Sequence, residues 1–226
     1  MNSKRQLRRK SRRLKGYDYS QPGDYFITTC THKRLCVLGT SRAMAFHPSK
    51  IGQVVQRCWD EISEHFPNAR ARVLQIMPNH IHGIISITPQ IGPVGTRHAV
   101  SLQRFTGEKF GMPRRGSLST IIRSFKSAVT NSVHRAGLFT EKMFWQSRFY
   151  DHVIRDNISY FFIERYIKLN PVLWHLDIEN PLVLDDEKNL QQLRHHLLRN
   201  LDLDPLAVEH VIANEIKYRV WRRKNS

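Results

Sequence analysis

The chain has few acidic residues, few cysteines and no long apolar run. Only 19 Asp and Glu stand against 36 Lys and Arg, a formal net charge of +17, so we expect a polyanionic partner, with nucleic acid first. Cys30, Cys36 and Cys58 are odd in number and lack C-x-x-C spacing, which argues against a disulfide framework and favours a reducing compartment. No stretch of about eighteen apolar residues occurs, so we expect a soluble, cytoplasmic protein without a membrane anchor.

The length and local composition predict one main domain with appendages. The chain of 226 residues is long enough for one well-packed core. Residues 1–15 carry eight basic residues and no acidic one, so we predict a tail over residues 1–20 that contacts phosphates rather than a merely solubilising arm. Residues 89–116 hold five Gly and three Pro, a pattern typical of either a disordered segment or a binding loop, and we expect poor order without a ligand. We place the main domain at residues 21–175 and a C-terminal helical extension at residues 176–226.

Hydrophobic periodicity predicts alternating strands and helices. Strands are expected at residues 25–30, 72–77, 80–87 and 144–154, and helices at residues 51–66, from Ser117 onward and after Asp156 or Asn157. This order is close to a ferredoxin-like α+β fold, an antiparallel sheet with helices on one face. Two further helices are predicted at residues 186–199 and 205–221. They are expected to cover the core, although a separate DNA-reading module stays an alternative.

Two residue pairs have spacings that fit one chemical site. His80 and His82 are separated by one residue in a predicted strand, so their side chains share a face and can hold one metal ion. Ile81, Ile85 and Ile87 point to the opposite face. Tyr166 and Asn170 are four residues apart in a predicted helix, so Asn170 can complete the coordination while Tyr166 presents a hydroxyl nucleophile. Pro171 places Asn170 in the last helical turn.

Each of these residues also has a common structural explanation. Paired histidines on a strand are more often surface residues, and a helical tyrosine beside Ile163 and Ile167 is more often a packing residue. Taken singly, each residue favours the structural explanation; the joint occurrence of both pairs on a basic chain, together with the resemblance of the segments around both pairs to a known family, favours the functional interpretation. Tyr150 is a second candidate nucleophile, which we interpret as a packing or base-stacking residue.

Four segments of the chain resemble the single-tyrosine HUH transposases, and most closely the REP-associated tyrosine transposases. They are Met77-Pro78-Asn79-His80-Ile81-His82-Gly83, Phe144-Trp145-Gln146, Tyr150–Asp156 and Tyr166-Ile167-Lys168-Leu169-Asn170-Pro171-Val172. The resemblance spans about residues 21–175. It implies cleavage and rejoining of single-stranded DNA beside hairpin-forming repeats through a covalent 5′-phosphotyrosine. Tyr166 would be the nucleophile, with His80, His82 and Asn170 as metal ligands. It also implies a bacterial-type, nucleoid-associated protein that acts as a monomer or homodimer.

The expected cofactor is Mg or Mn, because phosphate chemistry favours these ions, although two imidazoles also suit Zn or Fe. Two other functions stay open: a noncatalytic ferredoxin-like module that binds structured single strands, and a metal-dependent nuclease that uses water. We further predict DNA contacts for five basic residues: Arg114, Arg115, Arg123, Lys126 and Arg148.

Overall fold

The computed structural model of the protein describes residues 17–42, 45–89, 114–177, 179–181 and 186–199 and most of residues 205–216. Residues 1–16 of the predicted tail and residues 90–113 of the predicted binding loop lie outside this part of the chain. The elements, in order, are β1 (Gly23–Cys30), the 3₁₀ turn η1 (His32–Arg34), β2 (Gly39–Arg42), β3 (Ala45–Pro48), α1 (Lys50–Asp60), α2 (Ile62–His65), β4 (Ala69–Ile76), β5 (His80–Ile87), α3 (Leu118–Arg135), β6 (Tyr150–Ile154), α4 (Asn157–Leu173), η2 (Trp174–Leu176) and α5 (Asp186–Arg199).

The main sheet has the strand order β4-β5-β1-β6, and all three of its pairings are antiparallel. With α1 between β1 and β4 and α3 between β5 and β6, this is the predicted ferredoxin-like β-α-β-β-α-β arrangement. The α+β class is therefore confirmed. Strands β2 and β3 form a separate two-stranded sheet. In the β1–β5 register Cys30 pairs with His80 and Thr28 with His82, so the histidines lie where β1 ends.

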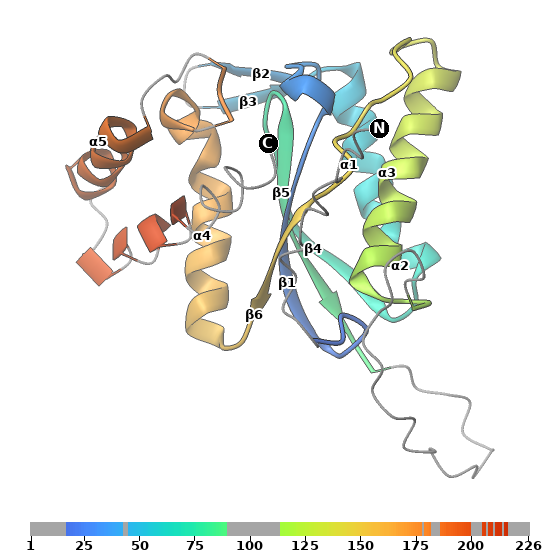
Figure 1. The fold of residues 1–226 in the computed structure, drawn as a ribbon, viewed down its shortest axis with the longest axis horizontal. Helices are drawn as coiled ribbons and strands as arrows, with labels where there is room; N and C mark the ends of the chain where they lie inside the picture. The colour runs from blue at the N-terminus through green and yellow to red at the C-terminus, as the bar shows by residue number, and fades with distance from the viewer. Residues whose placement is uncertain are drawn as a thin grey trace, which may run out of the picture.

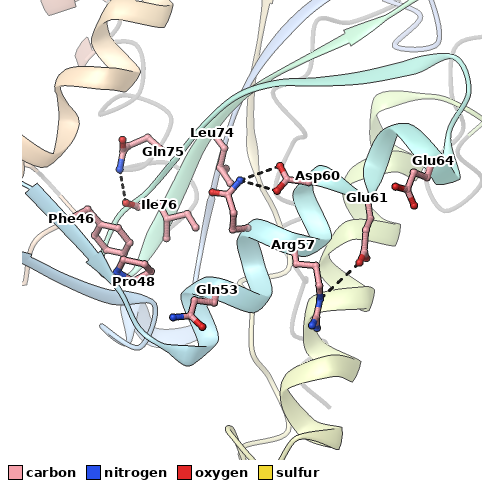
Figure 2. Close-up of a pocket in the computed structure, with 11 residues that line it drawn as sticks. Phe46, Pro48, Gln53, Arg57, Asp60, Glu61, Glu64, Leu74, Gln75 and Ile76 are labelled. Carbon is pink, nitrogen blue, oxygen red and sulfur yellow. Dashed lines mark hydrogen bonds and ion pairs between the residues drawn. The ribbon is translucent and has the colours of Figure 1, made fainter.

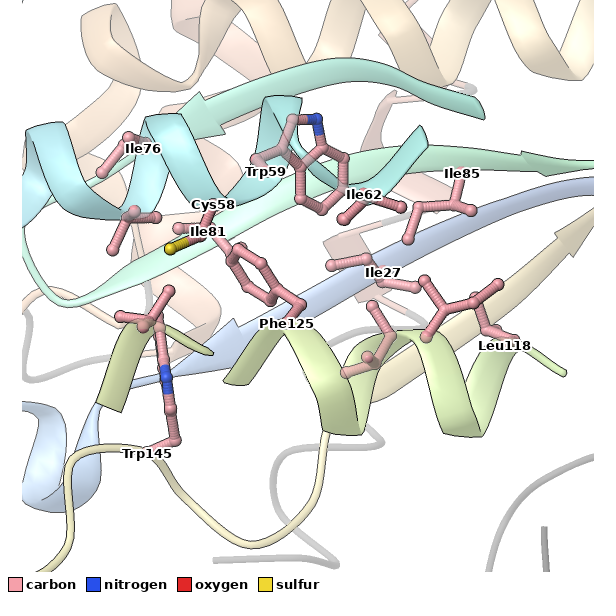
Figure 3. Packing of buried hydrophobic residues seen from close by; sticks show 14 of the residues in the cluster. Ile27, Cys58, Trp59, Ile62, Ile76, Ile81, Ile85, Leu118, Phe125 and Trp145 are labelled. Atoms are coloured by element: carbon pink, nitrogen blue, oxygen red, sulfur yellow. The ribbon is translucent and has the colours of Figure 1, made fainter. Parts of the chain in front are cut away.

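Helices α1 and α3 cover one face of the main sheet (Figure 1). Ile81 and Ile85 of β5 and Ile27 of β1 belong to this core, together with Trp59 of α1 and Phe125 of α3. Figure 3 shows these side chains filling the space between the two helices and the strands. The rings of Trp59 and Phe125 meet edge to face at 5.6 Å between centroids. The predicted apolar face of β5 is thus confirmed.

The opposite face of the sheet is covered by α4, which corrects the prediction that helices lie on one face only. Phe26 of β1 and Ile84 of β5 point to this side and pack with Ile163 and Ile167 of α4. The alternation of β1 and β5 explains the second layer, because both strands carry apolar side chains on each face. The same cluster includes Leu193 and Leu197 of α5 and, from residues 205–216, Val208, Val211 and Ile212. The C-terminal helical residues therefore pack on α4.

Side-chain caps define where the long helices begin. Ser49, Ser117 and Asp156 each accept a hydrogen bond from a backbone N–H of the first turn of α1, α3 and α4. The predicted helix over residues 51–66 is divided into α1 and α2 at Glu61.

The predicted strand over residues 144–154 is shorter, because β6 begins at Tyr150 and Trp145 makes only an isolated bridge with Thr31. Among the residues that the structure describes, none of the helices combines the length and apolar character needed to span a bilayer. The division into tail, main domain and extension stays a prediction.

Candidate metal and tyrosine site

The two histidines of β5 converge on the face covered by α4. The Nε2 atoms of His80 and His82 lie 3.0 Å apart, and the ring centroids are 4.6 Å apart. Both side chains are buried, with exposures of 0% and 1%. The strand spacing produces this geometry because residues i and i+2 point to the same side. Two imidazole nitrogens thus face one point, as ligands of a shared cation do.

Hydrogen bonds at the other ring nitrogen, Nδ1, fix the orientation of both histidine rings. Nδ1 of His80 lies 2.9 Å from Oδ1 of Asn79, and Nδ1 of His82 lies 2.8 Å from Oγ1 of Thr28. The Asn79 amide nitrogen donates to the carbonyl oxygens of Glu179 and Arg34, so its Oδ1 is the acceptor toward His80. The His80 proton therefore sits on Nδ1, and Nε2 accepts the 3.0 Å hydrogen bond from Nε2 of His82; a bound cation would take the place of the proton in that contact.

Asp177, which the sequence did not indicate, brings a carboxylate to the two imidazoles. Its Oδ2 lies 3.5 Å from Nε2 of His80. Ligand atoms of His80, His82 and Asp177 all lie within 4.8 Å of one another. The other oxygen, Oδ1, accepts a hydrogen bond of 2.7 Å from the backbone N–H of Glu179, which holds the carboxylate with Oδ2 toward the histidines. The three residues form a buried group that could hold a divalent ion.

Tyr166 and Asn170 lie on the side of α4 that faces these histidines. The ring centroids of Tyr166 and His82 are 5.4 Å apart. The Asn170 amide donates a hydrogen bond of 2.9 Å to the Tyr166 carbonyl. Both side chains are buried. The structure therefore brings together the four residues of the predicted site. Pro171 is accommodated within α4, which continues to Leu173.

The hydroxyl of Tyr166 donates a hydrogen bond of 2.9 Å to Oε2 of Glu215, a buried residue near the C-terminus. The cavity between α4 and the C-terminal helical residues measures only about 10 Å³ and is lined by Tyr166, Asn170, Asp177, Leu193 and Glu215, among others. This space is too small for a phosphate group. In this arrangement a phosphodiester reaches Tyr166 only if the C-terminal segment moves away.

Burial determines the protonation of the site. It lowers the pKa of His80 from 6.5 to about 4 and that of His82 well below 6.5, so both rings are neutral at physiological pH. Burial also raises the pKa of Tyr166 well above 10, and the carboxylates of Glu215 and Asp177 raise it further. A neutral imidazole is ready to bind a cation, whereas the phenol needs a nearby positive charge to become a nucleophile.

Of the five basic residues predicted to contact DNA, four are exposed and Lys126 is half-buried. Arg115, Arg123 and Arg148 are exposed. Arg114 forms an ion pair with Asp18, with 2.7 Å between Nη1 and Oδ2. Nζ of Lys126 donates to the Gln146 carbonyl, and burial lowers the pKa of this amine to about 8. Arg123 and Lys126 belong to α3, across the sheet from the histidines, and DNA contacts by these residues stay predictions.

A second, larger cavity lies away from the histidines. It measures about 540 Å³ and lies between α1 and the edge strand β4 (Figure 2). Two of its acidic side chains have partners on α1: Gln56 donates to Asp60, and Arg57 pairs with Glu61 at 3.8 Å. Volume alone would select this cleft, but it contains neither the histidines nor Tyr166. The side chains that could bind a metal or act as a nucleophile lie in the buried site between β5 and α4.

Four residues of the site were missed from the sequence. Thr28 and Glu215 lie far from the two motifs along the chain, and only folding brings them there. Asp177 follows Asn170 by seven residues but lies beyond the end of α4, so the helical spacing did not indicate it. Asn79 directly precedes His80, so its place in the sequence was the one signal that could have indicated a contact with the histidines.

The chain is similar to a protein of Haemophilus influenzae described as uncharacterized, with 36% identity over 174 residues, which cover 75% of this chain and 91% of that protein. No known family model matches the sequence. Among solved structures, a REP-associated tyrosine transposase bound to a REP hairpin has a TM-score of 0.46 and 21% identity, covering 72% of each chain. A candidate transposase from Deinococcus radiodurans has a TM-score of 0.39 and 15% identity, covering 70% of this chain and 96% of the other. Because these scores and identities are low, the activity must be inferred from the site itself.

Proposed function

This chain belongs to the family of the Haemophilus influenzae protein, and we propose that it is a metal-dependent enzyme that cleaves and rejoins single-stranded DNA through a covalent 5′-phosphotyrosine. The observation that carries the proposal is the position of Tyr166 beside the His80–His82 pair, 5.4 Å between the ring centroids of Tyr166 and His82. A nucleophile next to a cation site fits phosphoryl transfer. The net charge of +17 supports a polyanionic substrate.

The residues present fit a divalent cation. His80 and His82 would bind through Nε2, and Asp177 and Asn170 would supply oxygen ligands. The carboxylate of Asp177 adds the negative charge that a set of two histidines and one amide lacks, which favours Mn or Mg. When bound, the ion would supply Lewis acidity toward the phosphate and stabilise negative charge on the phenolic oxygen.

The residues of the chain then account for the reaction. The Tyr166 oxygen attacks phosphorus as its proton passes to water, a tyrosine–phosphorus bond forms, and the bond from phosphorus to the 3′ oxygen breaks. The departing oxygen takes up a proton and becomes a free 3′-hydroxyl. Rejoining is the reverse attack by a 3′-hydroxyl on the phosphotyrosine. Because the covalent bond conserves the energy of the phosphodiester, no external nucleotide is needed.

The resemblance of the His80 and Tyr166 motifs to REP-associated tyrosine transposases supports hairpin-forming repeats as the DNA substrate. It also supports a bacterial-type, nucleoid-associated protein acting as a monomer or homodimer. These finer statements belong to the proposal. They depend on the same two motifs as the assignment of Tyr166.

The Tyr166→Phe variant tests the proposed nucleophile. It should abolish nicking of a labelled hairpin oligonucleotide in Mn or Mg while leaving hairpin binding nearly unchanged, since only the hydroxyl is lost. Tyr150→Phe is the matched control, because Tyr150 is also a buried tyrosine of the same cluster. Full cleavage by the Tyr166→Phe protein would contradict the assignment.

A further inference from the structure

We propose that the His32–Arg34 turn, formed by residues His32, Lys33 and Arg34, binds a backbone phosphate of the DNA strand beside the metal-binding histidines, with Lys33 as the contacting residue. This inference depends on the proposed function for the nature of the ligand. It adds a DNA contact outside both sequence motifs. The structural observations that lead to it are the backbone conformation, the anchoring and the position of the turn.

The backbone of the turn is unusual. Lys33 has φ 53° and ψ 17°, and Arg34 has φ 56°. Within the described residues these are the two non-glycine positions in the left-handed region. Such a conformation is strained for a residue with a Cβ atom and is formed most easily by Gly or Asn. Strained positions that persist are concentrated at binding and catalytic sites. A lysine and an arginine here suggest a function for the charges.

Contacts with the metal-site residues hold the turn in place. The Arg34 carbonyl accepts a hydrogen bond of 3.3 Å from the Asn79 amide, which also bonds to His80 through Oδ1. The Arg34 guanidinium forms an ion pair with Glu179, which is 1% exposed and lies two residues after Asp177. At the other end of the turn, the backbone N–H of His32 donates to the Phe144 carbonyl at 2.8 Å. The turn is thus linked to the histidine strand and to the Asp177 segment.

The same anchoring leaves Lys33 at the surface. Arg34 directs its charge to Glu179, whereas Lys33 is exposed. The turn follows β1 directly, and Cys30 at the end of β1 pairs with His80. Lys33 is therefore presented at the end of the sheet that carries the metal ligands. A lysine binds phosphate as a point charge, so this position suits a phosphate next to the cleaved one.

Salt-dependent binding tests the role of Lys33. The parent would be the full-length Tyr166→Phe protein, which prevents turnover, and the probe a fluorescent hairpin with a single-stranded 5′ extension. Its Kd is measured by anisotropy between about 50 and 200 mM salt. Loss of one phosphate contact should reduce the slope of log K against log salt by about 0.7 and weaken binding about fivefold near 0.1 M salt. Lys33→Gln should show this change, and Lys33→Arg should retain the parent slope.

Two further variants separate this contact from general charge and from turn distortion. Arg70→Gln removes an exposed charge at the opposite end of the sheet, where Arg70 pairs with Ser86, and should keep the parent slope. Lys33→Gly fits the left-handed conformation without strain, so it should bind as weakly as Lys33→Gln and melt no lower than the parent. A Lys33→Gly protein that binds like the parent would overturn the assignment.

Neutral methylphosphonates placed singly along the extension locate the contact. A substitution next to the cleavage position should weaken binding by the parent and leave the Lys33→Gln protein unaffected. Equal weakening of both proteins at every position would overturn the inference and leave the proposed function intact. If the parent bound no DNA, the proposed function itself would fail, and the inference with it.

Discussion

Acid should destabilise the folded protein through the buried histidines. The pKa of His80 falls from 6.5 to about 4 because burial disfavours the charged ring. The unfolded chain therefore takes up a proton at His80 at a higher pH than the folded chain does. This contribution to stability is fully present above pH 6.5 and is lost as the pH falls toward 4. His82 acts in the same direction.

The magnitude follows from the two pKa values of His80. At 1.36 kcal/mol per tenfold difference, the free energy of unfolding should fall by about 2 kcal/mol at pH 5 and by about 3 kcal/mol below pH 4 from this residue alone. Urea denaturation with a chelator present, at several pH values from 7.5 down to about 4.5, measures this fall. His80→Asn keeps a hydrogen-bonding group beside Asn79 but cannot titrate, so its curve should be flatter.

The matched control is His65→Asn, which removes an exposed histidine and should follow the wild type in its pH dependence. The comparison uses the slopes, because the His80→Asn variant also alters packing at neutral pH. Parallel curves for the wild type and His80→Asn would refute the claim that a neutral, buried His80 is held in the folded state. The ring would then be charged or solvated in the native protein.

Three further predictions concern the core and the site. Gly83→Ala should lower the free energy of unfolding by about 1–3 kcal/mol, because the new Cβ would lie 2.3 Å from Cη2 of Trp59. Urea titrations measure this change, and an unchanged unfolding midpoint would contradict the close packing of β5 on α1. Asp177→Asn should weaken Mn²⁺ binding at least about tenfold in an electron paramagnetic resonance titration, whereas Asp60→Asn on the surface of α1 should not; equal affinities would exclude Asp177 as a ligand. Glu215→Ala should speed single-turnover cleavage, because it removes the hydrogen bond of 2.9 Å between the C-terminal segment and the Tyr166 hydroxyl, and an unchanged rate would show that this contact does not limit access to the phenol.

The sequence predicts well which face of the sheet a side chain lies on where polar and apolar residues alternate regularly along a strand. The two-residue period of β5 separates Ile81 and Ile85 from His80 and His82, and the structure confirms that separation. The four-residue spacing of Tyr166 and Asn170 places both on one side of α4 for the same kind of local reason. The prediction failed for residues 144–149, because aromatic residues favour a strand but also pack well in a loop. Phe144 and Trp145 are buried there without joining β6.

The remainder of the site depends on contacts that no local pattern encodes. Asp177 reaches His80 because the chain turns back after α4 through η2, and Glu215 reaches Tyr166 from 49 residues away. Thr28 reaches His82 through the β1–β5 register. The layer of helices on the second face was missed for a related reason. Apolar residues on both faces of β1 and β5 require cover on each side, which the prediction of a one-sided sheet did not include.

The most direct measurement is a denaturing gel of a labelled hairpin with a 5′ extension, incubated with the protein and Mn²⁺ or Mg²⁺. We predict a DNA band shifted by covalent attachment of the protein, its loss with chelator, and a phosphorylated peptide containing Tyr166 in mass spectrometry. Cleaved DNA without attached protein would instead indicate hydrolysis by water. An adduct that maps to Tyr150, or binding without cleavage in either metal, would contradict the account.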